Sequence, residues 1–237
     1  MRQLVSMALL ISWSAFVRAD TPSYLLEVMP VLTKAGCNQG ACHGKGHEQN
    51  GFKLSLRGYA PDDDYRQLTK DSAARRVDLA KPVGSLLLSK PLAETPHEGG
   101  KVFRKTSREY TTLLAWIEAG APGPVAKERS IRSLALSPTD KTLSPNSRQQ
   151  LIATATFSDG TTADVTWLTK FDSNDAGVAR VGANGDVLPC DPCRKNMPVS
   201  SVIRPGVSPT STGEGAPADE SVDGQIIFSI RNLGHFV

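Results

Sequence analysis

The stretch Cys37-Asn-Gln-Gly-Ala-Cys42-His43 is the most informative part of this chain, because it places two thiols just before an imidazole. Such a cluster can hold a haem covalently: the two sulfurs form thioethers with the vinyl groups, and the histidine binds the iron from one side. The usual motif has two residues between the cysteines, whereas this one has four. The stretch therefore predicts a lengthened haem site, with Cys37 and Cys42 as the thioether residues and His43 as the proximal iron ligand.

Residues 1–19 have the pattern of an export signal. Arg2 lies near the start, an apolar run extends from Leu4 to Val17, and small or modest side chains follow up to Ala19. The run is short for a transmembrane helix, which favours a cleaved signal peptide over an anchor. Haem is joined to cysteine pairs only after export across the bacterial membrane. We therefore expect an exported protein, either periplasmic or at the cell surface.

Two other interpretations of the cysteines fit the same compartment. Cys37 and Cys42 could form a small disulfide, or the two cysteines with His43 and His47 could form a Cys2His2 zinc site. A disulfide across so short a loop is strained, and zinc sites are commonest where thiols stay reduced. Haem is favoured over both.

Composition narrows the class of protein. The net charge of +3 is small, and basic residues do not alternate with aromatic ones, so a nucleic-acid partner is not expected. The sequence has no second apolar stretch long enough to span a membrane after the signal. Residues 20–237 are enough for two small domains.

The hydrophobic pattern changes near Pro122-Gly-Pro124. Before this point helical spacing dominates, with a helix expected at residues 107–119 and an earlier one leading into Cys37. After it, alternation of period two predicts half-buried strands, including residues 151–157 and the pair Val165 and Trp167. We expect a domain at 20–125 and another at 130–188.

Residues 189–237 change character again. The segment 189–224 is rich in proline, glycine and serine, which predicts a linker or a disordered tail. Residues 225–230 are the only later strand candidate. Cys190 and Cys193 are followed by Arg194 where a second haem motif would need histidine, so we expect a disulfide or free thiols there.

The opposite face of the iron needs a second ligand or stays open. The methionines are at positions 1, 7, 29 and 197, so none lies between the motif and the end of the first domain. His97 lies in the irregular loop Thr95–Gly100, shortly before the helix at 107–119, which makes it the predicted distal iron ligand. The alternatives are an ordinary exposed loop histidine at 97, and His47 as the ligand.

Several segments of the first part resemble the planctomycete cytochrome c domain, in family order across residues 24–122. The segments are Val31–Gly44, Asn50–Gly58, Ser85–Leu88, Pro96–His97 with Gly99–Gly100, and Leu114–Ile117 with Ala119–Pro122. The lengthened cysteine spacing belongs to this family's pattern. The resemblance implies one covalently bound haem c and electron transfer; the redox partners of the family are poorly defined.

Other polar residues near the motif have a binding and a structural interpretation. Lys53 and Arg57 are candidates for contacts to the haem propionates, although basic residues more often lie on a solvated face. Asp62, Asp63 and Asp64 follow Pro61 and are better explained by a helix N-terminus than by a cation site. Trp116 and Tyr110 are expected in the core.

The second part resembles the bacterial Ig-like domain of group 2 over residues 131–188. The matching segments are Leu134–Pro138, Gln150–Leu151, Ala155–Gly160, Asp164–Thr166, Asp172–Asp175, Val178–Val181 and Gly185. The resemblance implies a β-sandwich that acts as a spacer or interaction module, without catalytic residues. The closing strand expected after Val187 is replaced by the proline-rich segment. Either Ile226–Ile230 fills the gap or the domain is incomplete, and we favour the second.

The sequence thus predicts a multidomain chain, with a mostly α cytochrome-c-like domain followed by an all-β Ig-like sandwich. We expect an electron carrier rather than an enzyme, with cell-surface components as candidate partners of the Ig-like part. The alternatives are a non-catalytic surface protein with a zinc or disulfide site in place of haem, and a haem enzyme with an open iron position. A third alternative is that the chain is the N-terminal piece of a longer protein.

Overall fold

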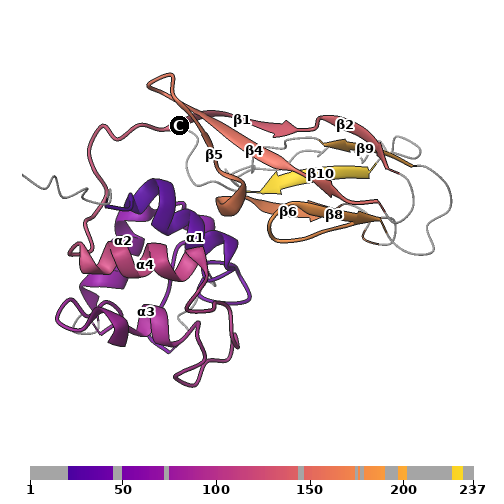
Figure 1. Ribbon diagram of the computed structural model, residues 1–237. Coiled ribbons are helices and arrows are strands. Elements are labelled where there is room, and N and C mark those ends of the chain that lie inside the picture. Colours follow the sequence, from indigo (N-terminus) through magenta and orange to yellow (C-terminus); the bar gives the residue numbers. More distant parts are fainter. Residues whose placement is uncertain are drawn as a thin grey trace, which may run out of the picture.

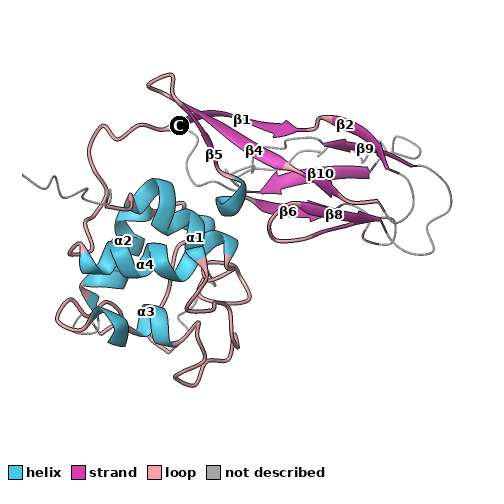
Figure 2. Cartoon of the chain, viewed as in Figure 1, coloured by secondary structure: helices cyan, strands magenta, loops and turns pink. Residues whose placement is uncertain are grey.

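The computed structural model describes residues 21–44, 50–71, 75–143, 147–173, 176, 179–189, 197–201 and 226–231. A helical part, at residues 24–118, precedes a part made of β-sheets, at residues 131–188, and Figures 1 and 2 show the two lying next to each other. The expected order of an α part and then a β part is confirmed. The predicted export signal, His47, Cys190 and Cys193 lie outside the described residues.

In the residues that the structure describes, the helical part contains four α-helices joined by loops and short tight turns. They are α1 (Met29–Lys34), which continues a π-helical turn at Tyr24–Val28, then α2 (Pro61–Thr69), α3 (Leu86–Ser89) and α4 (Arg108–Glu118). Ser107 caps α4, because its hydroxyl accepts a hydrogen bond of 3.3 Å from the backbone N–H of Tyr110. The helix expected at 107–119 is therefore confirmed. None of the helices in the described segments is long and apolar enough to cross a membrane.

The core of the helical part lies between its first and last helices. The Tyr24 ring centre is 5.8 Å from that of Trp116 and 5.2 Å from that of Tyr65. The indole N–H of Trp116 donates to the carbonyl oxygen of Pro122 at 2.9 Å, which satisfies a donor that burial would otherwise leave unpaired. Trp116 and Tyr110 are both buried, as the sequence predicts.

The acidic run at the start of α2 has a second use. Asp62, Asp63 and Asp64 lie in the first turn of α2, as expected, but no side chain caps that helix. The carboxylate of buried Asp64 instead accepts hydrogen bonds from Ser55, at 2.5 Å from the backbone N–H and 2.6 Å from the hydroxyl. Asp64 therefore ties α2 to the segment that follows the cysteine motif.

Within its described segments, the β part contains three small sheets. The first sheet has the strand order β1 (Ile131–Ser137), β4 (Ile152–Phe157), β5 (Thr162–Asp164). The second sheet has the order β2 (Asp140–Leu143), β9 (Met197–Ser201), β10 (Ile226–Arg231), β6 (Lys170–Ser173). The third sheet has the order β3 (Gln149–Gln150), β8 (Asp186–Pro189), β7 (Ala179–Val181). All pairs are antiparallel except β9 with β10. Ala153, Ala155 and Phe157 are buried on alternate positions of β4, as its pattern predicts.

One expected strand of the β part is absent from the described residues, and one strand candidate is present. Val165 and Trp167 do not form a strand: β5 ends at Asp164, whose carboxylate accepts from the backbone N–H of Thr166 at 2.9 Å and starts a 3-10 turn. The strand candidate near residue 226 is present as β10, which pairs with β6. Two segments of the region expected to be a tail, β9 and β10, thus belong to a sheet.

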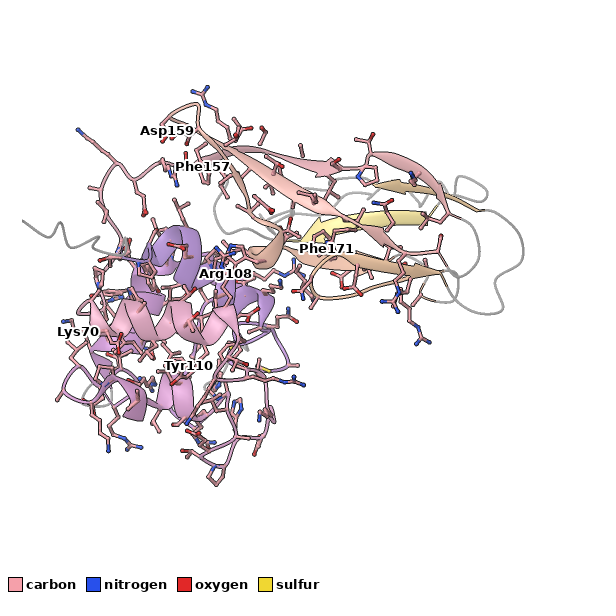
Figure 3. The ribbon with its side chains drawn as sticks, in the orientation of Figure 1. Lys70, Arg108, Tyr110, Phe157, Asp159 and Phe171 are labelled. Carbon is pink, nitrogen blue, oxygen red and sulfur yellow. The ribbon has the colours of Figure 1, made fainter. Side chains whose placement is uncertain are left out.

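The 3-10 turn at Thr166–Leu168 also joins the two parts of the chain. Lys34, at the end of α1, donates from Nζ to the carbonyl oxygen of Trp167 at 2.5 Å. The guanidinium carbon of Arg108 lies 4.0 Å from the centre of the Trp167 ring, and Figure 3 shows Arg108 at the boundary between helices and strands. The hydrogen bond therefore holds the turn on α1, and the cation–π contact holds it on α4.

Candidate functional site

The end of α1 determines where the cysteine motif begins. Gly36 has φ of +82°, a left-handed conformation that a residue with a side chain rarely adopts. The Gly36 N–H donates to the carbonyl of Thr33 at 3.1 Å and the Cys37 N–H to that of Leu32 at 2.9 Å, a Schellman motif. This ending turns the chain sharply and places Cys37 directly beyond the helix.

The loop from Cys37 to Gly44 is closed by backbone hydrogen bonds. The N–H of His43 donates to the carbonyl of Cys37 at 2.9 Å, and the N–H of Cys42 donates to that of Gln39 at 2.9 Å. A Cβ at position 44 would lie 2.2 Å from the carbonyl oxygen of Asn38, so only glycine fits there. The four residues between the cysteines therefore form a compact turn, which brings His43 back to Cys37.

Cys37 and Cys42 are both free thiols and both are partly buried. Burial, with the nearby Cys42, raises the pKa of Cys37 to about 12, so its sulfur is protonated at neutral pH. A metal ion is bound by thiolates, so a zinc ion at this position would have to displace the proton from Cys37. Within the described segments no three His, Cys, Asp or Glu side chains are grouped so that they could hold a metal ion.

His43 is oriented by Phe52. Its Nδ1 lies 3.3 Å from the carbonyl oxygen of Phe52, and because a carbonyl only accepts, this contact is a hydrogen bond when the proton is on Nδ1. The other ring nitrogen, Nε2, then carries the free lone pair that binds metals. Burial lowers the pKa of His43, so the neutral imidazole, which is the ligand form, dominates at neutral pH.

His97 has the same arrangement in a different loop. Its Nδ1 lies 3.0 Å from the carbonyl oxygen of Gly100, and the Gly100 N–H donates back to the His97 carbonyl at 2.9 Å. A Cβ at Gly99 would lie 2.9 Å from Cε1 of the His97 ring, so glycine makes room for the imidazole. The half-buried ring of His97 therefore also leaves Nε2 available.

The fold brings the two histidines together. The ring centres of His43 and His97 are 6.5 Å apart, and the ring planes differ by only 11°. Two imidazoles that bind one metal from opposite sides, through bonds of about 2 Å, have ring centres about 6 Å apart. The separation lies at the long end of the range for offset-stacked rings and also matches two imidazoles that share a metal. The donor set of the site, two thiols and two imidazoles, thus fits a covalently attached haem with two axial histidines.

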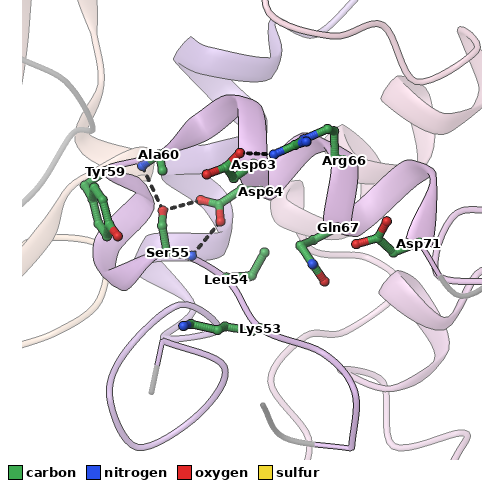
Figure 4. A pocket seen from close by; sticks show the side chains of 10 residues that line it. All are labelled: Lys53, Leu54, Ser55, Tyr59, Ala60, Asp63, Asp64, Arg66, Gln67 and Asp71. Atoms are coloured by element: carbon green, nitrogen blue, oxygen red, sulfur yellow. Dashed lines mark hydrogen bonds and ion pairs between the residues drawn. The ribbon is translucent and has the colours of Figure 1, made fainter. Parts of the chain in front are cut away.

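The two candidate propionate contacts lie on the exposed surface. Arg57 has φ of +58°, and its backbone N–H donates to the Asn38 carbonyl at 3.0 Å. Lys53 lines a cavity of about 380 Å³, together with Asp64 and residues of α2, shown in Figure 4. Arg57 is thus tied to the cysteine loop by its backbone, whereas Lys53 faces a cavity on the α2 side.

Sequence reasoning missed Phe52, which lies beside His43, and Arg76, which lies beside Phe52. The ring centre of Phe52 is 4.5 Å from that of His43, and the guanidinium carbon of Arg76 is 4.5 Å from the Phe52 ring centre. Arg76 is buried, with 7% of its surface exposed. A buried arginine is unusual, but nothing in the local sequence around position 76 distinguishes it from a surface arginine.

Comparison with known proteins found no matching family model and no matching curated protein.

Proposed function

We propose that this chain is a c-type cytochrome that binds one haem and transfers single electrons. The observation that carries the proposal is the pair His43 and His97, which two separate loops bring to a ring-centre distance of 6.5 Å with each Nδ1 at a backbone carbonyl. Each Nδ1 is held by a backbone carbonyl, an arrangement typical of metal-binding histidines. The approach of two such imidazoles from separate loops supports a shared axial metal site.

Each residue has a distinct role in this proposal. Cys37 and Cys42 hold the haem covalently, His43 is the proximal ligand and His97 the distal one. The haem supplies one-electron exchange when bound. The chain supplies the attachment, the orientation of the two imidazoles through Phe52 and Gly100, and a partly buried setting that limits the access of water.

The two parts of the chain and its N-terminal segment are each assigned a role in this proposal. We assign the helical part to the planctomycete type of cytochrome c domain and the β part to a bacterial Ig-like sandwich that acts as a spacer or interaction module. Export follows from the signal pattern at residues 1–19 and from the place where haem is attached to cysteines. Redox proteins are the partners of the first part, and cell-surface components are the candidate partners of the second.

Covalent attachment is tested in a bacterial host competent for cytochrome c maturation. We expect the purified chain to give a pyridine haemochrome spectrum and a haem-stained band in a denaturing gel. Cys42→Ser should lose most of the stain, whereas Cys193→Ser, which removes a cysteine outside the motif, should keep it. A colourless wild-type protein that binds zinc instead would refute the proposal.

The axial ligands are tested on the same preparation. With ring planes differing by only 11°, two imidazoles should give a rhombic low-spin ferric EPR signal, not the highly anisotropic signal of perpendicular planes. His97→Ala should convert the spectrum to high spin and allow cyanide or carbon monoxide to bind. His47→Ala is the matched control and should leave the spectrum unchanged. If the two variants exchange these results, His47 is the distal ligand.

A further inference from the structure

The buried residue Arg76, beside Phe52, connects several segments of the helical part. Arg76 lies between α2 and α3, and its guanidinium donates from Nη1 to the carbonyl oxygen of Gln67 at 2.7 Å and from Nη2 to that of Gly51. Its own carbonyl accepts from the backbone N–H of Leu87 at 3.0 Å. One side chain thus joins the end of α2 to the segment that precedes Phe52, and its backbone is fixed by α3.

These contacts continue to the proximal histidine. Arg76 holds Gly51 by a hydrogen bond and Phe52 by a cation–π contact, with 4.5 Å from the guanidinium carbon to the ring centre. Phe52 in turn holds His43 twice, through its carbonyl oxygen at 3.3 Å and through its ring at 4.5 Å. The orientation of the His43 imidazole therefore depends on Arg76 through a single intermediate residue.

Arg76 also brings a permanent charge close to the same imidazole. A guanidinium stays ionised at any physiological pH, and a buried charge is screened less by water and salt than an exposed one. The guanidinium carbon of Arg76 lies 4.5 Å from the Phe52 ring centre, and the His43 ring centre lies 4.5 Å from the same point. The distance from the guanidinium carbon to the His43 ring centre is therefore at most the sum of these two distances.

We propose that Arg76 positions His43 through Phe52 and raises the reduction potential of the site. This inference rests on the proposed haem function. Reduction by one electron lowers the net charge of the site by one unit, with no bond made or broken and no proton needed. A fixed positive charge nearby favours the state with the smaller positive charge, which is the reduced one.

The test compares three full-length, haem-loaded variants with the wild type by spectroelectrochemistry, in which the electrode supplies the electron. Arg76→Met removes the charge and keeps much of the length, and we expect the equilibrium constant for reduction to fall by about tenfold, which is about 59 mV for a one-electron couple. Arg76→Lys keeps the charge and should keep the potential. Arg108→Met, which removes a charge at the Trp167 contact, is the matched control and should also keep it.

The EPR spectrum separates positioning from charge. Arg76→Lys cannot hold Gly51 and Gln67 together as the two arms of arginine do, so the ring planes of His43 and His97 should no longer be nearly parallel, and the ferric signal should change. If Arg76→Met does not fold, Arg76→Lys decides the matter: an unchanged EPR signal overturns the positioning role. If Arg76→Met folds and keeps the wild-type potential, the charge effect is refuted. A wild-type chain without haem would instead refute the proposed function itself.

Discussion

The contact between Trp167 and the helical part gives a quantitative prediction. Trp167→Ala removes the indole ring that Arg108 covers at 4.0 Å but keeps the carbonyl that accepts from Lys34. An exposed cation–π pair contributes about 1 kcal/mol. A half-buried indole buries about 100 Å² of surface, which at about 25 cal/mol per Å² adds about 2.5 kcal/mol. We expect the substitution to lower the free energy of unfolding by about 3.5 kcal/mol.

A double-mutant cycle isolates the share that holds the two parts together. Trp167→Ala, Arg108→Ala and the double variant are unfolded in urea, and the coupling energy should be about 0.5–1 kcal/mol. Limited proteolysis should also cut the connecting segment at residues 121–130 faster in Trp167→Ala. Tyr59→Ala is the control, because that ring is 68% exposed on the helical part. Additive effects together with unchanged proteolysis would refute a fixed contact between the parts.

Two further predictions concern the helical part. Burial raises the pKa of Asp64 above its ordinary value despite the hydrogen bonds from Ser55, so the folded state favours the protonated carboxyl. As the pH rises from about 4, the unfolding free energy of the wild type should therefore fall relative to that of Asp64→Asn. Urea titrations of both proteins at several pH values measure this difference. A difference that does not change with pH would contradict the prediction. Gly58→Ala should destabilise the fold by about 1–2 kcal/mol or more, because φ is +75° and the new Cβ would lie 2.7 Å from Cε of Met29. Gly100→Ala is the control, because its φ is +66° and no atom lies within 4 Å of the new Cβ. If thermal unfolding shows that both variants lose the same stability, the contact with Met29 has no measurable cost.

The sequence by itself determined the features that depend on neighbouring residues. The helix Arg108–Glu118 begins after a serine cap and keeps one apolar face, so periodicity and capping locate it. The alternation in Ile152–Phe157 predicts its strand for the same reason. The sequence also places Cys37, Cys42 and His43 in one short segment, as the proposed haem attachment needs.

The tertiary structure decided which distant residues meet. His97 was chosen from the sequence by eliminating methionines, but only the fold brings its ring within 6.5 Å of His43. Arg76 lies beside Phe52 and Trp167 beneath Arg108 because loops pack against elements far away in the chain, and no local pattern encodes such a contact. Local patterns reflect the free energy of a short segment, whereas these contacts depend on packing of the whole core, which a single sequence does not reveal.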